Sequence, residues 1–313
     1  MSPPSHSVAP LQQTPIRARP IDLVQVPAWS KLRWLLHGFS TRTGGMTTVY
    51  KPDEQAGELN LGFTASDPKE TVLANRRRFV AAVTKNAATP LVTLKQIHSS
   101  IVHVVGNAVH VVGNAAAGDE AIHQGDGIMI DEPGILLGIQ TADCIPVLIA
   151  DRKQRAVAAF HAGWRGTLKR IVENGVGRMR LEFGSRPEDL TAAIGPGIGA
   201  CCYAVGEEVR MEFESQFSYA SELFSEVYDS NPVKEKYPLL FLTARAPGHS
   251  NIGPAMHLDL IEANRRQLLH AGLSAGNIFV QGDCTSCRTD RYFSHRAEHG
   301  FTGRSLSVIG IKK

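Results

Sequence analysis

The stretch QTADCIPVLIADRKQRAVAAFHAGWRGT, residues 140–167, gives the clearest structural signal in this chain. It contains two short apolar runs, CIPVLIA (144–150) and AVAAF (156–160), whose length and composition are typical of buried strands. Cys144 opens the first run and His161 follows the second. Both side chains therefore lie where a predicted strand meets a loop, and rigid scaffolds often hold functional groups at such places.

Further strand-like and helix-like segments surround this stretch. Strands are predicted at LVTL (91–94), GIMI (127–130), GILLGI (134–139), TAAI (191–194), IFV (278–280) and SLSVIGI (305–311). Apolar spacing and helix-start signals predict helices after Asp67-Pro68 and over 168–183, 207–217 and 258–271. The mixture is irregular, so we expect an α+β fold: a single domain over 21–313 with a mixed, largely buried β-sheet and flanking helices.

The composition excludes several classes of protein. The chain has 313 residues, of which 43% are hydrophobic and 20% charged, and no apolar run approaches the roughly 18 residues of a membrane helix. Residues 1–20 are rich in Pro, Ser and Gln and lack an apolar signal-peptide core, so we expect a disordered tail. The five cysteines show no disulfide framework, which predicts reduced thiols and a cytoplasmic protein. A net charge of +3 without a basic cluster argues against a nucleic-acid partner, and we also expect no membrane partner.

The heptapeptide VHVVGNA occurs twice in tandem, over 102–108 and 109–115. A solenoid needs longer repeats in several copies. We therefore interpret the duplication as a longer hairpin or a bulged loop without chemistry of its own.

Cys144 and His161, together with His98 after the 91–94 strand, allow three interpretations. They could be ordinary core residues, a nucleophile and its base, or metal ligands. Two imidazoles and one thiolate are a good zinc set, because three protein ligands leave the fourth position open. The same donors suit copper, but oxygen-reducing copper oxidases use paired His-x-His motifs, and this sequence has none. We therefore favour zinc.

The other four cysteines lie in two pairs. Cys284 and Cys287 form a C-x-x-C motif, and His295 and His299 follow it in an order like that of a zinc finger. The intervening loop of seven residues is shorter than the usual ~12–15 residues, so we favour ordinary reduced thiols over a second, structural zinc. We assign no chemistry to the adjacent pair at 201–202.

Arginines in glycine-rich loops suggest an anionic substrate. Arg42 lies in FSTRTGG beside Ser40, and hydroxyl, guanidinium and backbone N–H groups together could cradle an oxyanion or phosphate. Arg165, next to Trp164 in HAGWRG, and Arg296 are the further candidates.

Ten motifs, taken together and in order, resemble the YfiH-like family, also called the laccase-domain or polyphenol oxidoreductase family. The resemblance covers about residues 35–311. The motifs are HGFSTRTGG, ELNLGF, NRRRF, KQIHS, GDGIMI, TADCIPVLI, AFHAGWRGT, AIGPGIGACCYAVG, HLDLIEANRRQL and CTSC…YFSHR…GFTGR.

The resemblance implies an intracellular zinc enzyme that acts on purine nucleosides. It implies phosphorolysis of adenosine, inosine, guanosine and methylthioadenosine, with adenosine deaminase activity beside it. Carried over by motif, the metal ligands are His98, Cys144 and His161, and Arg296 is the arginine implicated in activity. The partners would be a purine nucleoside and phosphate, and the chain would be a monomer or a homodimer.

Roles for the remaining candidates follow from this reading. Arg42, Arg296 and Arg165 are candidates to hold phosphate. Trp164 and Tyr203 are candidates to stack on the base. Asp143, beside a predicted ligand, would orient neighbouring groups or act as a general acid or base.

Two features of the resemblance leave alternatives open. Where the family often has a second arginine after Arg296, this chain has Ala297. The fold also resembles that of deamidating bacterial toxins, which makes a cysteine hydrolase with Cys144 as nucleophile and His161 as base the main alternative. The older family name adds copper-dependent polyphenol oxidation as another. No partner-binding helix or repeat surface in the sequence favours a non-enzymatic role.

Overall fold

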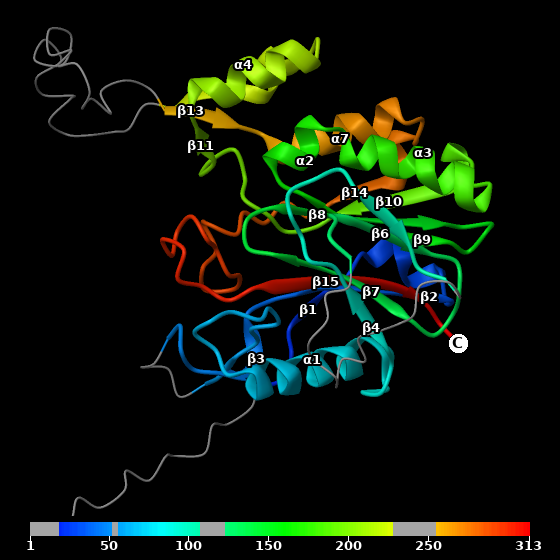
Figure 1. Cartoon of the computed structure of the whole chain (residues 1–313), viewed down its shortest axis with the longest axis vertical. Helices are drawn as coiled ribbons and strands as arrows, with labels where there is room; N and C mark the ends of the chain where they lie inside the picture. Colours follow the sequence, from blue (N-terminus) through cyan, green and yellow to red (C-terminus); the bar gives the residue numbers. More distant parts are fainter. Residues whose placement is uncertain (1–18, 52–55, 107–122, 228–254) are drawn as a thin grey trace, which may run out of the picture.

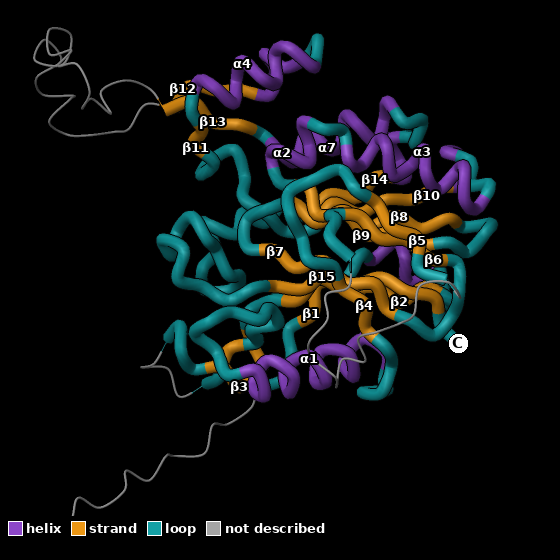
Figure 2. The backbone as a smooth tube through the Cα atoms, viewed as in Figure 1, coloured by secondary structure: helices purple, strands orange, loops and turns teal. Residues whose placement is uncertain are grey.

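A computed structural model describes residues 19–51, 56–106, 123–227 and 255–313, which are arranged in layers (Figure 1). Helices lie on the outer face of a six-stranded sheet, a five-stranded sheet packs against its other face, and one long helix covers the far side (Figure 2). The expected α+β class is confirmed. In the described residues, the β-structure is divided over two large stacked sheets and one small sheet rather than a single sheet.

The six-stranded sheet contains both predicted strands of the 140–167 stretch. Its strand order is β14 (Ile278–Val280), β10 (Leu190–Ile194), β8 (Ile145–Asp151), β9 (Val157–Ala162), β6 (Gly127–Ile130) and β5 (Val102–Val104). The central pair β8–β9 is antiparallel, and its register places Pro146 opposite His161. This pairing brings Cys144, the residue immediately before β8, beside the end of β9.

The five-stranded sheet joins distant parts of the chain. Its order is β1 (Leu23–Val24), β2 (Leu35–Ser40), β15 (Ser305–Ile311), β7 (Leu136–Thr141) and β4 (Leu91–Thr93). The last strand, β15, is antiparallel to both β2 and β7. A separate short strand, β3 (Thr43–Thr47), bridges to Glu58.

The helices cover the outer faces of both sheets. They are α1 (Lys69–Thr84) on the five-stranded sheet and α2 (Trp164–Leu168), α3 (Ile171–Phe183) and α7 (Leu260–His270) on the six-stranded sheet, with α4 (Glu207–Gln216) at one end (Figure 1). Near α4 lies a small sheet of β11 (Ala204–Val205), β13 (Ala255–Leu258) and β12 (Phe224–Val227). Short 3-10 helices occur at Pro27–Lys31, Pro187–Asp189, Ala220–Leu223 and Ala275–Asn277.

Alternation along the strands builds the core on both sides of each sheet. In β8, Ile145, Val147 and Ile149 face the helices, whereas Leu148 and Ala150 face the other sheet. Successive side chains of a strand point to opposite faces, so a strand that is covered on both sides must be apolar throughout. This explains why the 144–150 run is nearly continuous in apolar residues.

The predicted helices are present, with one interruption. The helix expected over 168–183 begins earlier, at Trp164, and is broken by Arg170, whose φ of 57° lies in the left-handed region. Gly175 has a low helix propensity, but close packing of α3 against the sheet requires a glycine at this position. A Cβ at this position would lie 2.3 Å from the ring of Phe160 in β9, so only glycine lets α3 approach the sheet this closely.

Two expectations from the sequence concern segments that the structure describes only in part. The first VHVVGNA copy contains β5, and the second copy (109–115) lies outside the described residues, as do residues 1–18 of the tail predicted over 1–20. Within the described residues, no helix combines the length and apolar character needed to span a bilayer.

His37 in β2 should make stability depend on pH. Its side chain is 6% exposed, and its Nε2 accepts the Val26 backbone N–H at 2.9 Å, which requires a neutral ring. Burial lowers the pKa of His37 to about 4, below the 6.5 expected for the unfolded chain. The stabilisation is therefore complete above pH 6.5 and is lost as the pH falls towards 4, because only the unfolded chain binds the proton over that range.

We expect this histidine to reduce the free energy of unfolding by about 2–3 kcal/mol between neutral pH and about pH 4.5. Urea denaturation of the wild type and of His37→Gln, which keeps an acceptor but does not titrate, measures the difference. Equal acid-induced losses in the two proteins would show that His37 does not titrate in this way.

Candidate metal centre

The structure brings together the three predicted ligands. His98 lies in the loop after β4, Cys144 immediately precedes β8, and His161 lies within β9. Their ligand atoms are all within 4.8 Å of one another. The two imidazole rings meet edge to face, with centroids 4.9 Å apart. Three donors of this type at this spacing match the coordination preferences of zinc.

Asp126, which lies just before β6, holds the two histidines in place. Its Oδ1 accepts one hydrogen bond from the ring Nδ1–H of His161 at 2.8 Å and another from the backbone N–H of His98 at 3.0 Å. Its Oδ2 accepts the backbone N–H and hydroxyl of Ser99 at 2.6 and 2.7 Å. Since Nδ1 of His161 is bound to Asp126, Nε2 is the nitrogen left to bind a metal. A carboxylate behind a histidine ligand is a common arrangement at zinc sites.

The charges at the site favour a thiolate beside an imidazolium. Burial alone would raise the pKa of Cys144, but the charge of His161 and hydrogen bonds from His161 and His98 lower this pKa to about 6. Burial lowers the pKa of His161, but Cys144 and Asp126 outweigh it and raise this pKa to about 9. For Asp126, burial is outweighed by hydrogen bonds from His161 and Ser99, which lower its pKa to about 2. A metal cation would take the place of the proton between the thiolate and the imidazole.

Two backbone features let the ligands converge. His98 has a φ of 58°, a left-handed conformation that the contacts of its loop with Asp126 hold in place. At Gly163, an added Cβ would lie 3.0 Å from Cys144 Sγ and 3.2 Å from His98 Cδ2. The glycine in HAGWRG therefore leaves the space that the donor atoms use.

Asp143, the neighbour of Cys144, organises the surrounding loops. It is 8% exposed, and its Oδ1 accepts the hydroxyls of Thr285 and Ser294, both at 2.7 Å. Its Oδ2 accepts the Arg296 backbone N–H at 2.6 Å. Asp143 thus fixes the C-terminal loop that carries Arg296 next to Cys144. With three donors already on its oxygens, it acts here as an orienting group.

Tyr203 and Arg296 also lie close to the site. The Arg296 guanidinium stacks over the Tyr203 ring at 5.2 Å and donates to the Ala204 carbonyl at 2.9 Å. Burial raises the pKa of Tyr203 to about 12, and the negative charge of Cys144 contributes in the same direction. Arg165 stacks on its neighbour Trp164 at 4.2 Å and acts on Tyr203 in the opposite direction. Tyr203 and Arg296 therefore form one stacked pair and Trp164 and Arg165 form another, and the charges of Cys144 and Arg165 both act on Tyr203.

A cavity of about 470 Å³ opens onto the three donor residues. This volume is in the range of small-molecule sites. Besides the donors, the cavity is lined by Phe63, Thr64, Leu94, Lys95, Gln96, Gln140, Thr141, Ala142, His295 and Arg304. Among these described lining residues are two basic side chains, Lys95 and Arg304, and neither an aspartate nor a glutamate. The cavity is therefore suited to an anion.

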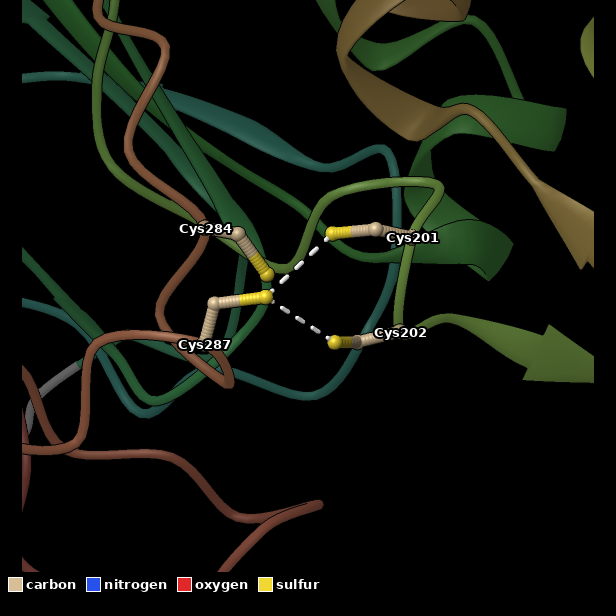
Figure 3. Close-up of side chains that lie close together, drawn as sticks. All are labelled: Cys201, Cys202, Cys284 and Cys287. Atoms are coloured by element: carbon tan, nitrogen blue, oxygen red, sulfur yellow. Dashed lines mark hydrogen bonds between the residues drawn. The ribbon is translucent and has the colours of Figure 1, made fainter. Parts of the chain in front are cut away.

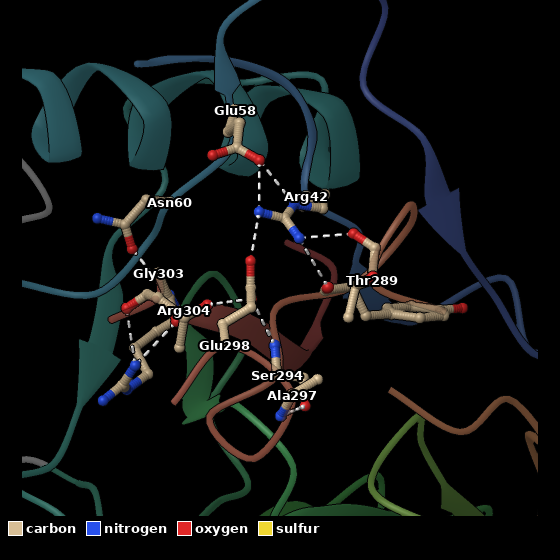
Figure 4. Close-up of polar contacts among 11 residues, drawn as sticks. Arg42, Glu58, Asn60, Thr289, Ser294, Ala297, Glu298, Gly303 and Arg304 are labelled. Atoms are coloured by element: carbon tan, nitrogen blue, oxygen red, sulfur yellow. Dashed lines mark hydrogen bonds and ion pairs between the residues drawn. The ribbon is translucent and has the colours of Figure 1, made fainter. Parts of the chain in front are cut away.

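Ser40 and Arg42 do not belong to this cavity. The five N–H groups of the Arg42 guanidinium are matched by five contacts, to Glu58 (twice), Glu298 and the carbonyls of Thr289 and Tyr292 (Figure 4). Ser40 Oγ accepts the Leu306 backbone N–H at 2.9 Å. We predicted an anion cradle here, but the structure shows a buried ion network that joins the N- and C-terminal loops.

Sequence reasoning missed Asp126 and most of the cavity wall. Asp126 is in GDGIMI, and a carboxylate directly before a buried strand was a usable signal. Lys95 and Gln96 precede His98 in KQIHS, and Arg304 ends GFTGR, so all three lie in the quoted motifs. Nothing in their spacing showed that they share one cavity.

The fold and site define an α+β protein with a candidate three-donor transition-metal centre on the wall of a cavity. The chain belongs to the family described as multi-copper polyphenol oxidoreductase laccase, whose model matches residues 36–312. This confirms the resemblance seen in the motifs.

Named relatives are similar over nearly the whole chain. Purine nucleoside phosphorylase YlmD of Geobacillus stearothermophilus is 33% identical over 302 residues, covering 93% of this chain and 98% of that protein. A purine nucleoside phosphorylase of Deinococcus radiodurans is 36% identical over 278 residues, covering 88% and 89%. The crystal structure of hypothetical protein YfiH from Bacillus licheniformis has a TM-score of 0.76 at 31% identity, covering 93% and 96%.

Proposed function

We propose that this protein is a zinc-dependent purine nucleoside phosphorylase with adenosine deaminase activity. The substrates would be adenosine, inosine, guanosine and methylthioadenosine. The observation that carries the proposal is the cavity that joins a His₂Cys donor set to Lys95 and Arg304. The names of the relatives support the reaction class.

The donor set fits zinc by chemistry and by geometry. His98, Cys144 and His161 would hold the ion, and Asp126 would orient His161 through Nδ1. When bound, zinc would supply a Lewis acid that polarises a substrate atom or a water molecule.

Phosphorolysis requires phosphate to attack C1′ of the ribose while the purine leaves. The residues of this chain contribute by binding and orientation, because holding two reactants together removes most of the entropic barrier. Lys95 and Arg304 would bind phosphate from the cavity wall. Tyr203, braced by Arg296, would stack on the base. Gln96 bonds twice to the Gln140 backbone, at 2.7 and 2.8 Å, and would keep the wall rigid.

The direct test is product formation. The zinc-loaded protein should convert inosine and phosphate into hypoxanthine and ribose 1-phosphate, and should convert adenosine into inosine and ammonia without phosphate. A panel of the four nucleosides with and without phosphate separates the two activities. Absence of turnover on every nucleoside, with zinc present, would exclude the proposal.

Replacing Arg304 by alanine should raise the KM for phosphate about 10- to 100-fold, because a charge-assisted contact contributes about 1.5–3 kcal/mol. The KM for inosine should change little. Steady-state kinetics over both substrates measures the two effects. Arg178→Ala, whose guanidinium pairs with Glu182 on the surface of α3, is the matched control. If Arg296→Ala raises the phosphate KM and Arg304→Ala does not, the anion binds beside Tyr203 instead.

A second candidate function rests on a specific observation. Cys144, His161 and Asp126 are arranged as a nucleophile, a base and the group that orients the base. This is the arrangement of a cysteine hydrolase. The two functions differ in what zinc does, because a thiolate bound to zinc is not free to attack. Alkylation of Cys144 that is equally fast with and without zinc, together with amide hydrolysis, would favour the hydrolase.

A further inference from the structure

A second group of possible metal ligands, made of four cysteine sulfurs, lies near the molecular surface. Cys201 and Cys202 lie in the loop after β10, and Cys284 and Cys287 lie in the loop after β14 (Figure 3). The four Sγ atoms are all within 4.8 Å of one another. Apart from Cys144, these are all the cysteines in the chain. The sequence had suggested no role for Cys201 and Cys202 and ordinary thiols at the other two positions.

We propose that these four cysteines form a structural zinc site, separate from the His98 centre. Structural zinc sites of the four-cysteine type hold the ion in a tetrahedron with Zn–S bonds of about 2.3 Å, which places neighbouring sulfurs about 3.8 Å apart. Cys287 Sγ lies 3.5 Å from Cys201 Sγ and 3.3 Å from Cys202 Sγ. Small outward shifts of the side chains would therefore admit the ion.

The backbone around the sulfurs is shaped for this arrangement. Cys284 forms a parallel bridge with Gly197, and its sulfur accepts the Gly199 backbone N–H at 3.2 Å. A Cβ on Gly199 would lie 3.3 Å from both Cys284 Cβ and Cys201 Sγ. The C-x-x-C turn is closed by the Arg288 N–H, which donates to the Cys284 carbonyl at 3.1 Å. Such a turn is a common way to present two thiolates to zinc.

The partner of the C-x-x-C motif is therefore the 201–202 pair and not the two histidines that follow it in sequence. His295 lines the cavity with His98. A disulfide is the main competing fate of clustered cysteines. The geometry does not single out one pair, because Cys287 is nearly equidistant from Cys201 and Cys202. Four sulfurs around one centre suit a cation better than any particular disulfide.

The proposed ion would stabilise loops that reach the His98 centre. The Ile198 N–H donates to the Asp143 carbonyl at 2.7 Å, and the Thr285 hydroxyl donates to the Asp143 carboxylate at 2.7 Å. The Tyr203 N–H donates to the Gly199 carbonyl at 3.1 Å. A zinc ion joining the two loops would thereby fix Asp143 and Tyr203, so its role is positional.

The test is metal analysis of variants that separate the two sites. Wild-type protein, purified with reductant and zinc, should carry two zinc ions per chain by native mass spectrometry. His98→Ala/His161→Ala should retain one, and Cys284→Ser/Cys287→Ser should lose one and retain the other. X-ray absorption of the histidine variant should show zinc bound by sulfur alone. Loss of this site should also lower the thermal midpoint while leaving purine turnover dependent on the remaining ion.

Two results would overturn the proposal. One is a folded histidine variant that binds no zinc while its thiols are reduced. The other is a wild-type mass that shows disulfides among these cysteines after purification under reductant. If the cysteine double variant does not fold, the X-ray absorption spectrum of zinc in the wild type still tests the proposal. One sulfur-only site and one His₂Cys site together give more sulfur ligands per zinc ion than the His₂Cys site alone. Either failure leaves the test of nucleoside phosphorolysis unaffected.

Discussion

Cys144→Ala is expected to remove one zinc ion per chain and to reduce phosphorolysis by about 1,000-fold or more. A Lewis acid contributes several kcal/mol to a transition state, and each 1.4 kcal/mol corresponds to a factor of ten in rate. The thiolate also supplies the negative charge of the centre, so two imidazoles alone should not retain the ion. Metal analysis and inosine turnover on the same preparation measure both losses.

Ser100→Ala is the control for a change near the centre, because this side chain lies two residues from His98 and does not line its cavity. It should retain zinc and activity. A Cys144→Ala protein that keeps its full zinc content and turnover would show that the cysteine is not a ligand. One that keeps zinc and loses only amide hydrolysis would support the hydrolase.

Asp126→Asn is expected to weaken zinc binding about 10- to 100-fold and to destabilise the folded protein by about 2–4 kcal/mol. The carboxylate is fully buried and accepts five hydrogen bonds, from His161, His98, Ile97 and, twice, Ser99. In asparagine an NH2 group replaces one of the two carboxylate oxygens. The two or three N–H and O–H groups that donate to that oxygen would then face another donor and lose their acceptor. Chelator competition measures the affinity, and urea denaturation of the zinc-free protein measures the stability.

Asp131→Asn is the matched control, since this exposed carboxylate lies just after the other end of β6. It should change neither quantity. An Asp126→Asn variant with wild-type zinc affinity would mean that the carboxylate does not orient His161 for metal binding.

Local patterns in the sequence predicted the elements that hold the metal donors. The apolar runs over 144–150 and 156–160 became β8 and β9, and their antiparallel register explains how Cys144 and His161 meet. His98 was a candidate because it too follows a predicted strand, but no periodicity relates a loop after β4 to strands some fifty residues away, and the family motif was needed to assign it as a ligand. The division into two sheets depends on β15 pairing with both β2 and β7, which is equally non-local.

The wrong prediction at Arg42 has the same non-local origin. The glycine-rich loop around Arg42 predicted an anion-binding site, but the Arg42 guanidinium forms ion pairs with Glu58 and Glu298. A short stretch of sequence does not show that a residue such as Glu298, more than 250 residues away, pairs with the arginine. The clustering of Cys201 and Cys202 with Cys284 and Cys287 could not be predicted for this reason too, because the two pairs lie more than eighty residues apart.

The most direct test of the account is inosine turnover with phosphate, followed on one preparation as zinc is removed from and returned to the His98 centre. We expect hypoxanthine and ribose 1-phosphate to form in equal amounts, activity to fall with loss of the ion, and zinc to restore it in the wild type but not in Cys144→Ala. Phosphorolysis that persists undiminished after this centre has lost its zinc, or in Cys144→Ala, would contradict the account.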